Sequence, residues 1–198
     1  MDPCFRNRGK KMNTIVAISG SPSPVSRTEK VLGFLSDQLT DRGLSVKKIF
    51  ARQVDADILV RADDKARQIK EISKTLSRAD GILVVSPVYK MAYTGLLKVF
   101  FDLLPRDIFL GKPVLPVMIG GTDKHFMVLD LMLKPLLAFM KGETLQGIYL
   151  LDRQVAHGAS DHPPLHDKDI LRRIGTQLDL LIENAVYKTS SGDGTTPH

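Results

Sequence analysis

The sequence predicts an α/β domain in which parallel strands form one sheet and helices cover both of its faces. Apolar, β-branched stretches alternate along the chain with stretches of helical periodicity, and this alternation is typical of parallel sheets. Residues 81–86 form a continuous apolar run, as expected for a central strand that is buried on both faces. The length of 198 residues and the hydrophobic content of 43% are sufficient for one core of ordinary size.

Five strands and five helices are expected from these patterns. The predicted strands are residues 13–19, 45–50, 81–86, 113–119 and 145–151. The predicted helices are residues 27–41, 62–78, 94–104, 123–141 and 166–187. Gly43 is expected to follow the end of the first helix, and the polar segment 52–61 has no assignment. This order of elements favours the doubly wound, flavodoxin-like fold with a five-stranded parallel sheet in the order 2-1-3-4-5. In such sheets ligands bind at the carboxyl ends of the strands, so the loops after strands one, three and four should meet there.

The loop after the first strand combines the features of a phosphate site. It supplies hydroxyl groups and one cation, from Ser21, Ser23, Ser26, Thr28 and Arg27. These residues precede and begin a helix, where unpaired N–H groups and the helix dipole attract anions. Residues 26–29 also fit a capping box, in which Ser26 caps the helix and Glu29 reaches back to it. Capping explains Ser26 and Glu29, but it does not explain why Ser21, Ser23, Thr28 and Arg27 lie in the same turn. A phosphate site would explain these four residues.

The loops after the third and fourth strands are also unusual. Residues 86–95 contain two of the four tyrosines, and aromatic side chains at a sheet edge can frame a flat ring system. A helix capped by Thr94 with a tyrosine packed beneath it is the alternative. In the other loop, Gly120 and Gly121 allow a ligand to approach the backbone closely. Thr122 or the next residue should cap the following helix, and His125 is either a ligand contact or a surface histidine.

Several classes of protein are disfavoured. The first loop is neither G-x-G-x-x-G nor a nucleotide P-loop, and its strand does not end in acidic residues as a response-regulator receiver would. The sequence shows no metal-ligand spacing and no convincing Ser/His/Asp triad. Half of the net charge of +6 lies in residues 1–12, and the other basic residues are scattered, so no nucleic acid is expected as a partner.

Four motifs occur in a specific order: Gly20-Ser21-Pro22 with Ser26-Arg27-Thr28; Pro87-Val88-Tyr89-Lys90 with Tyr93-Thr94-Gly95 and Leu97-Lys98; Gly120-Gly121-Thr122 with His125; and Leu133-Lys134-Pro135. In these motifs the chain resembles the NADPH-dependent FMN reductases, and most closely their alkanesulfonate-type members, from residue 13 to residue 154. The resemblance implies a flavodoxin-like fold and reduction of FMN by NADPH.

The same resemblance implies roles for individual residues. The FMN phosphate would be held by Ser21, Ser26, Arg27 and Thr28. One side of the isoalloxazine would be bordered by Pro87, Val88, Tyr89 and Lys90. The other side would be lined by Gly120, Gly121, Thr122 and His125. No side chain is assigned to acid–base catalysis, because the hydride passes directly between the nicotinamide and the flavin.

The resemblance further implies that reduced FMN is supplied to a partner monooxygenase in sulfonate or organosulfur utilisation, and that the chain forms a homodimer or homotetramer. One alternative is a flavoenzyme that retains FMN and reduces quinones, azo dyes or metal oxyanions with NAD(P)H. The other is an electron-transfer flavodoxin without reductase activity, which the basic pI of about 9.4 disfavours. The sequence leaves open whether FMN is a substrate or a bound group, and whether NADPH or NADH is preferred.

One position departs from the family pattern. Some alkanesulfonate-type members carry a tyrosine three residues before the Lys-Pro pair, where this chain has Leu131. Pro135 still removes a hydrogen bond from the predicted helix 123–141, which indicates a kink or a π-type turn. The helix is apolar around most of its circumference, which favours a subunit interface, with deep burial as the alternative.

Residues 1–12 are expected to be a disordered extension, residues 13–187 the reductase domain, and residues 188–198 a disordered tail. No apolar run approaches the about 18 residues of a membrane span, and no signal segment is apparent. A single cysteine, Cys4, excludes an internal disulfide. These features favour a cytoplasmic protein without membrane contact.

Overall fold

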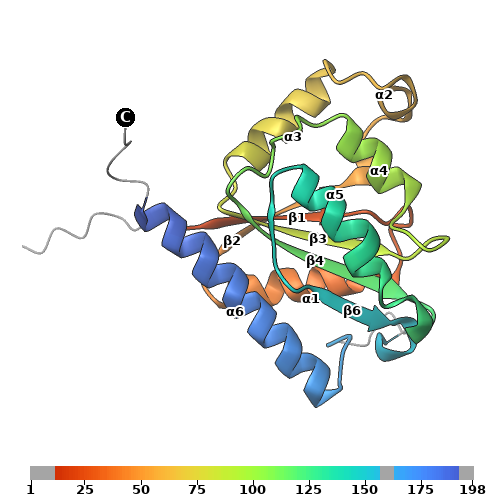
Figure 1. Ribbon diagram of the computed structural model, residues 1–198, viewed down its shortest axis with the longest axis vertical. Coiled ribbons are helices and arrows are strands. Elements are labelled where there is room, and N and C mark those ends of the chain that lie inside the picture. The colour runs from red at the N-terminus through yellow and green to blue at the C-terminus, as the bar shows by residue number, and fades with distance from the viewer. Residues whose placement is uncertain (1–11, 157–162, 192–198) are drawn as a thin grey trace, which may run out of the picture.

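The computed structural model describes residues 12–156 and 163–191, which form one sheet covered by helices on both faces (Figure 1). The strands are β1 (Thr14–Ser19), β2 (Ser45–Phe50), β3 (Gly81–Pro87), β4 (Pro113–Gly120), β5 (Glu143–Thr144) and β6 (Ile148–Leu151). All of their pairings are parallel, in the order β2-β1-β3-β4-β5, and β6 also pairs with β4. The predicted flavodoxin-like order is therefore confirmed. Most of the expected extension and tail, and part of the loop before the last helix, lie outside the described residues.

Alternate strand residues enter two separate cores. Val16 and Ile18 pack with α3 (Arg67–Ser77), α4 (Gly95–Asp102) and α5 (Lys134–Phe139) on one face. Ile15 and Ala17 pack with α1 (Arg27–Asp41) and α6 (Lys168–Ser191) on the other. Figure 1 shows these two groups of helices on opposite sides of the sheet. Because both faces are covered, every residue of β4 is buried, which explains the continuous apolar runs of the central strands.

The first half of the chain follows the predicted boundaries closely. Helix α1 and strand β2 have the predicted limits, and Gly43 follows the helix with a φ of 83° that favours glycine. The unassigned segment contains a short 3₁₀ helix, η1 (Ala51–Gln53), and the helix α2 (Ala56–Arg61). The predicted helix 62–78 begins later than expected, at Arg67, because Ala62 ends α2 in the left-handed conformation.

The predicted fifth strand, residues 145–151, begins later than expected, because only Ile148–Leu151 form the strand β6. The two-residue strand β5 precedes the predicted range, both strands pair with β4, and Gly147 lies between them with a φ of 83°. The Gly147 N–H donates to the side chain of Gln177 in α6 at 3.0 Å instead of continuing the sheet ladder. A Cβ at Gly147 would lie only 2.7 Å from the Pro116 carbonyl oxygen, so only glycine fits this close approach. The last helix, α6, extends to Ser191, beyond the predicted end at residue 187.

The predicted long helix 123–141 is not continuous. It consists of a 3₁₀ turn, η2 (Asp123–His125), a π-helix, η3 (Leu129–Leu133), and the short helix α5. Pro135 lies in the first turn of α5, where its missing N–H prevents regular α-helical bonding to the preceding turn. The widened turn expected from Pro135 is therefore confirmed.

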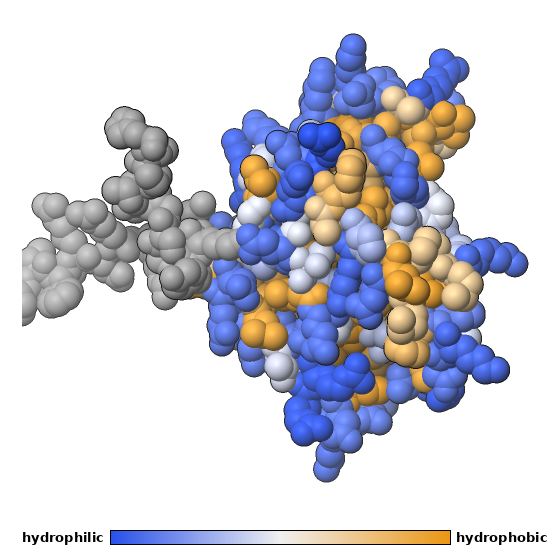
Figure 2. Space-filling view, in the orientation of Figure 1, coloured by the Kyte–Doolittle hydropathy of each residue, from blue (hydrophilic) through white to orange (hydrophobic). Residues whose placement is uncertain are grey.

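Exposed apolar side chains gather over this same segment (Figure 2). They are Phe126, Met127, Leu131, Met132 and Phe139, and we call this set the α5 face.

Within residues 12–156 and 163–191, no helix combines the length and the apolar character needed to cross a membrane.

Candidate functional site

Hydrogen bonds join the three predicted loops at the carboxyl edge of the sheet. The Thr94 hydroxyl, in the loop after β3, donates to the Gly20 carbonyl, in the loop after β1, at 2.6 Å. The Val88 N–H donates to the Ile119 carbonyl of β4 at 2.7 Å. Thr94 also caps α4 by accepting from the Leu97 N–H, so the predicted cap and the contact between loops coexist. The sheet topology thus brings the candidate residues of all three loops together.

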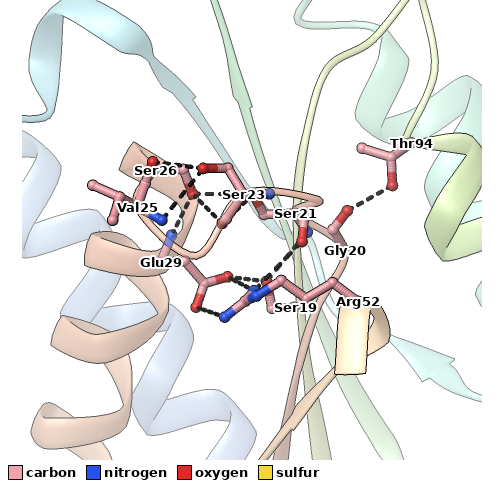
Figure 3. A network of polar contacts seen from close by, with 9 residues as sticks. All are labelled: Ser19, Gly20, Ser21, Ser23, Val25, Ser26, Glu29, Arg52 and Thr94. Atoms are coloured by element: carbon pink, nitrogen blue, oxygen red, sulfur yellow. Dashed lines mark hydrogen bonds and ion pairs between the residues drawn. The ribbon is translucent and has the colours of Figure 1, made fainter. Parts of the chain in front are cut away.

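The loop after β1 is held by its own hydroxyl groups (Figure 3). The hydroxyls of Ser21 and Ser26 lie 3.0 Å apart, and Ser21 also donates to the Ser23 carbonyl at 3.1 Å. The Ser23 N–H in turn donates to the Ser21 hydroxyl at 3.2 Å. Pro22 and Pro24 contribute no N–H groups, so side chains take over the hydrogen bonding of this turn.

Ser26 caps α1, because its hydroxyl accepts from the Glu29 N–H at 3.2 Å. The expectation that the Glu29 side chain reaches back to Ser26 is wrong. Its carboxylate instead accepts from the Arg52 guanidinium at 2.8 Å and from the Ser19 hydroxyl. A carboxylate forms stronger hydrogen bonds with a cation than with a neutral backbone N–H, which explains the different partner.

Arg27 occupies the first position of α1. Its Nε is buried and has no hydrogen-bond partner among the described residues. A buried donor of this kind costs free energy unless an acceptor is supplied, and a cationic donor at a helix N-terminus favours an anionic one. Thr28, the next residue, is only 2% exposed. The residues present therefore fit a phosphate group, with Arg27 as its cation.

The loop after β3 forms a tight hairpin. Tyr89 and Ala92 exchange two backbone hydrogen bonds of 2.8 and 3.0 Å. Lys90 and Met91 at the tip have φ values of 48° and 63°, a pair of left-handed conformations that side chains adopt at a cost. The Tyr89 side chain is 51% exposed beside this tip, whereas Pro87 and Val88 are half-buried. This strained hairpin leaves Tyr89 largely exposed, in the same loop whose Thr94 contacts the loop after β1.

The loop after β4 lies against β6. A Cβ on Gly120 would overlap the Tyr149 hydroxyl and would lie 3.2 Å from Cγ2 of Val88. The Tyr149 hydroxyl donates to the Thr122 carbonyl at 2.6 Å. Burial, and then the carboxylates of Asp152 and Asp123, raise the pKa of Tyr149, so the phenol stays protonated as a donor. Gly120 is thus required for the packing that holds this loop.

The other predicted residues of this loop lie nearer the surface. Gly121 is exposed, Thr122 caps η2 by accepting from the Lys124 N–H, and His125 is half-buried within η2.

Two residues in contact with these loops were not singled out from the sequence. Arg52 follows β2, and its position beside β1 in the sheet order is a signal that could have pointed to it. Tyr149 lies in β6 beneath the loop after β4. We find no sequence signal that distinguishes Tyr149 from an ordinary strand tyrosine.

Comparison with known proteins places the chain in one family. The family of NADPH-dependent FMN reductases matches residues 13–156. An FMN reductase (NADPH) of Pseudomonas putida is 38% identical over 150 residues, covering 75% of this chain and 76% of that protein. An FMN reductase (NADPH) of Escherichia coli is 33% identical over 166 residues, and the match covers 83% of this chain and 86% of that protein.

A solved structure agrees with these relatives. The apo form of an NADH:FMN oxidoreductase, EMOB, superposes with a TM-score of 0.77 at 31% identity, and the match covers 86% of this chain and 88% of that one. Sequence and structure together lead to one conclusion: the chain belongs to the NADPH-dependent FMN reductase family and is, as a member of it, an NAD(P)H-dependent FMN reductase.

Proposed function

We propose that FMN binds across the three loops, with its phosphate on Ser21, Ser26, Arg27 and Thr28. The observation that carries this proposal is the buried Arg27 Nε without a partner at the start of α1. A phosphate oxygen would supply the missing acceptor. Ser26 and Arg27 are less buried than the other two residues, so we place them in contact with the phosphate. Ser21 and Thr28 are almost fully buried, and the Ser21 hydroxyl is hydrogen-bonded to that of Ser26, so these two residues complete the site from its buried side.

We place the isoalloxazine between the other two loops. One set of contacts comes from the hairpin after β3, with Pro87, Val88, Tyr89 and Lys90. The other set comes from the loop after β4, with Gly120, Gly121, Thr122 and His125. The exposed Tyr89 and the open backbone at Gly121 support this placement, because both lie on the surface of the site.

NAD(P)H supplies the hydride and is oxidised to NAD(P)⁺, and bound FMN accepts that hydride. The chain's own residues hold the flavin in position for this transfer. We propose that reduced FMN then leaves as a product and serves a reduced-flavin-dependent monooxygenase in sulfonate or organosulfur metabolism, in the cytoplasm where NAD(P)H is available. Relatives named as FMN reductases support FMN as the substrate.

The test is NAD(P)H oxidation by the purified protein, followed at 340 nm with and without added FMN. We expect a colourless protein that oxidises NADPH or NADH only when FMN is present, with a rate that saturates with FMN. A protein that is yellow as purified and reduces a quinone or azo dye without free FMN would replace this proposal with a retained flavin. FMN binding without any oxidation of NAD(P)H would leave only an electron-transfer flavodoxin.

We further propose that the α5 face forms the contact between subunits of a homodimer or homotetramer. Five large apolar side chains exposed on one segment form the kind of surface that marks an interaction site. Leu131, at 63% exposure, lies within it, in the π-helix.

Leu131→Glu should lower the molar mass measured by light scattering after size-exclusion chromatography, because a charge would be buried without a partner. Leu110→Glu is the matched control, since Leu110 is 65% exposed in the turn before β4 and outside the α5 face. An oligomer of unchanged mass in Leu131→Glu would contradict this interface.

A further inference from the structure

A largely buried ion pair lies beneath the loop after β1. The Arg52 guanidinium donates to the two carboxylate oxygens of Glu29 at 2.8 and 3.4 Å. The side chains of Arg52 and Glu29 are only 16% and 13% exposed. Glu29 lies in the first turn of α1 and Arg52 in η1, so the pair connects two elements that flank β1 (Figure 3).

This pair holds both backbone groups of Ser21. The Arg52 guanidinium donates to the Ser21 carbonyl at 3.4 Å. The Ser21 N–H donates to the Ser19 hydroxyl at 3.2 Å, and that hydroxyl donates in turn to the Glu29 carboxylate. The Ser21 peptide is therefore held by Arg52 at its carbonyl and by Glu29, through Ser19, at its N–H.

Arg52 is itself fixed in place. Its guanidinium lies over the ring of Phe50, with the Cζ atom 4.5 Å from the ring centroid. A planar guanidinium held by a ring and a carboxylate is preorganised, so little entropy is lost when the loop accepts a ligand.

The charges of Arg52 and Glu29 also affect the binding of a phosphate at the N-terminus of α1. The Glu29 carboxylate and Arg27 share the first turn of α1, so an unneutralised carboxylate there would repel a phosphate bound at the helix N-terminus. Arg52 neutralises it in the free protein. Removal of Arg52 would leave a largely buried and unpaired negative charge beneath the loop, whereas removal of the Glu29 charge would not.

From these contacts we infer that Arg52 is a positioning residue: by neutralising the Glu29 carboxylate, it keeps the contacts of Glu29, Ser19 and Ser21 in the form that accepts a phosphate, and so sets selectivity for FMN over riboflavin. This inference rests on the proposed phosphate site. It adds that the selectivity depends on a residue outside the loop, and that it depends more on the cation of the pair than on the anion.

The experiment measures dissociation constants for FMN and for riboflavin, which lacks the phosphate, by quenching of flavin fluorescence. Arg52→Met should weaken FMN binding about tenfold and change riboflavin binding by less than about twofold. Glu29→Gln should keep the preference for FMN, because the amide oxygen still accepts from Arg52. Adding Glu29→Gln to Arg52→Met should recover most of the lost FMN affinity, because no buried charge remains unpaired.

Arg42→Met is the matched control. Arg42 follows the other end of α1 and forms a more exposed ion pair with Asp179, so this variant removes an arginine and an ion pair of the same helix far from the loop. It should leave both dissociation constants unchanged. Thermal melting of each variant reports whether it is folded. If Arg52→Met is unfolded, the test compares the double variant with Glu29→Gln instead. Their dissociation constants for FMN are expected to agree within about threefold.

The inference is overturned if Arg52→Met weakens FMN and riboflavin equally, or weakens neither. It is also overturned if Glu29→Gln loses the preference for FMN as fully as Arg52→Met does, or if the double variant recovers no FMN affinity. A wild-type protein that binds FMN no better than riboflavin would instead refute the phosphate site itself, so the two failures are distinguishable.

Discussion

Replacement of Arg27 by methionine is expected to weaken FMN binding about a hundredfold, while riboflavin binding changes by less than about threefold. Methionine retains an apolar side chain of similar length but removes the cation and the buried Nε donor. A charge-assisted bond to a phosphate in a partly buried position accounts for a loss of this size. The chain contains no tryptophan, so flavin fluorescence or titration calorimetry is the appropriate measurement.

The variant Arg27→Lys separates charge from geometry. Lysine keeps the positive charge at the start of α1 but lacks the planar fork of donors, so its FMN affinity should fall between those of the wild type and Arg27→Met. Equal FMN binding by the wild type and Arg27→Met would exclude Arg27 from the phosphate site. Parallel losses for FMN and riboflavin would indicate a structural role instead.

Substitution of Gly120 by alanine is the second change with a large expected effect. The new Cβ would overlap the Tyr149 hydroxyl and lie 3.0 Å from its Cζ, so the ring or the loop must move. Either movement breaks the hydrogen bond from Tyr149 to the Thr122 carbonyl. Overpacking of this kind costs about 1–3 kcal/mol of folding stability, and we expect kcat/KM for FMN to fall at least about tenfold.

Two companion variants test this explanation. Gly121→Ala is the matched control, because its Cβ would meet only the Asp152 carboxylate at an ordinary 3.6 Å, and it should retain most of the activity and the melting temperature. Gly120→Ala combined with Tyr149→Phe removes the oxygen that the new Cβ would overlap, and should recover part of the stability. Wild-type activity and melting temperature in Gly120→Ala alone would refute the packing argument.

Elements with a strong local pattern were predicted well. Helix α1 and strand β2 have the predicted limits, and the strand order follows from the alternation of strands and helices. The prediction of the strand at residues 145–151 failed in its first part, because a single glycine, Gly147, precedes the residues that pair as a strand. The strand predicted at residues 145–151 begins only at Ile148, after Gly147, where the Pro116 carbonyl comes too close for any side chain. No periodicity within the strand reveals that contact.

The candidate site divides in a similar way. The hydroxyl-rich turn, the tyrosine-bearing loop after the third strand and the diglycine loop were recognised from their residue types, and the sheet order predicted that they would meet. The partner of Glu29 was predicted wrongly, because a capping box considers only neighbours within one turn. The actual partner, Arg52, lies 23 residues after Glu29 in the sequence and carries a full positive charge.

The sequence by itself determined the elements, the order of the strands and the chemistry of the three loops, because periodicity, turn residues and capping act over a few neighbouring residues. Only the tertiary structure decided which distant groups complete the site. Arg52 beneath the loop after β1 and Tyr149 behind Gly120 reach their partners through strands that lie side by side in the sheet. Such contacts depend on strand register and on close packing, which no local pattern encodes.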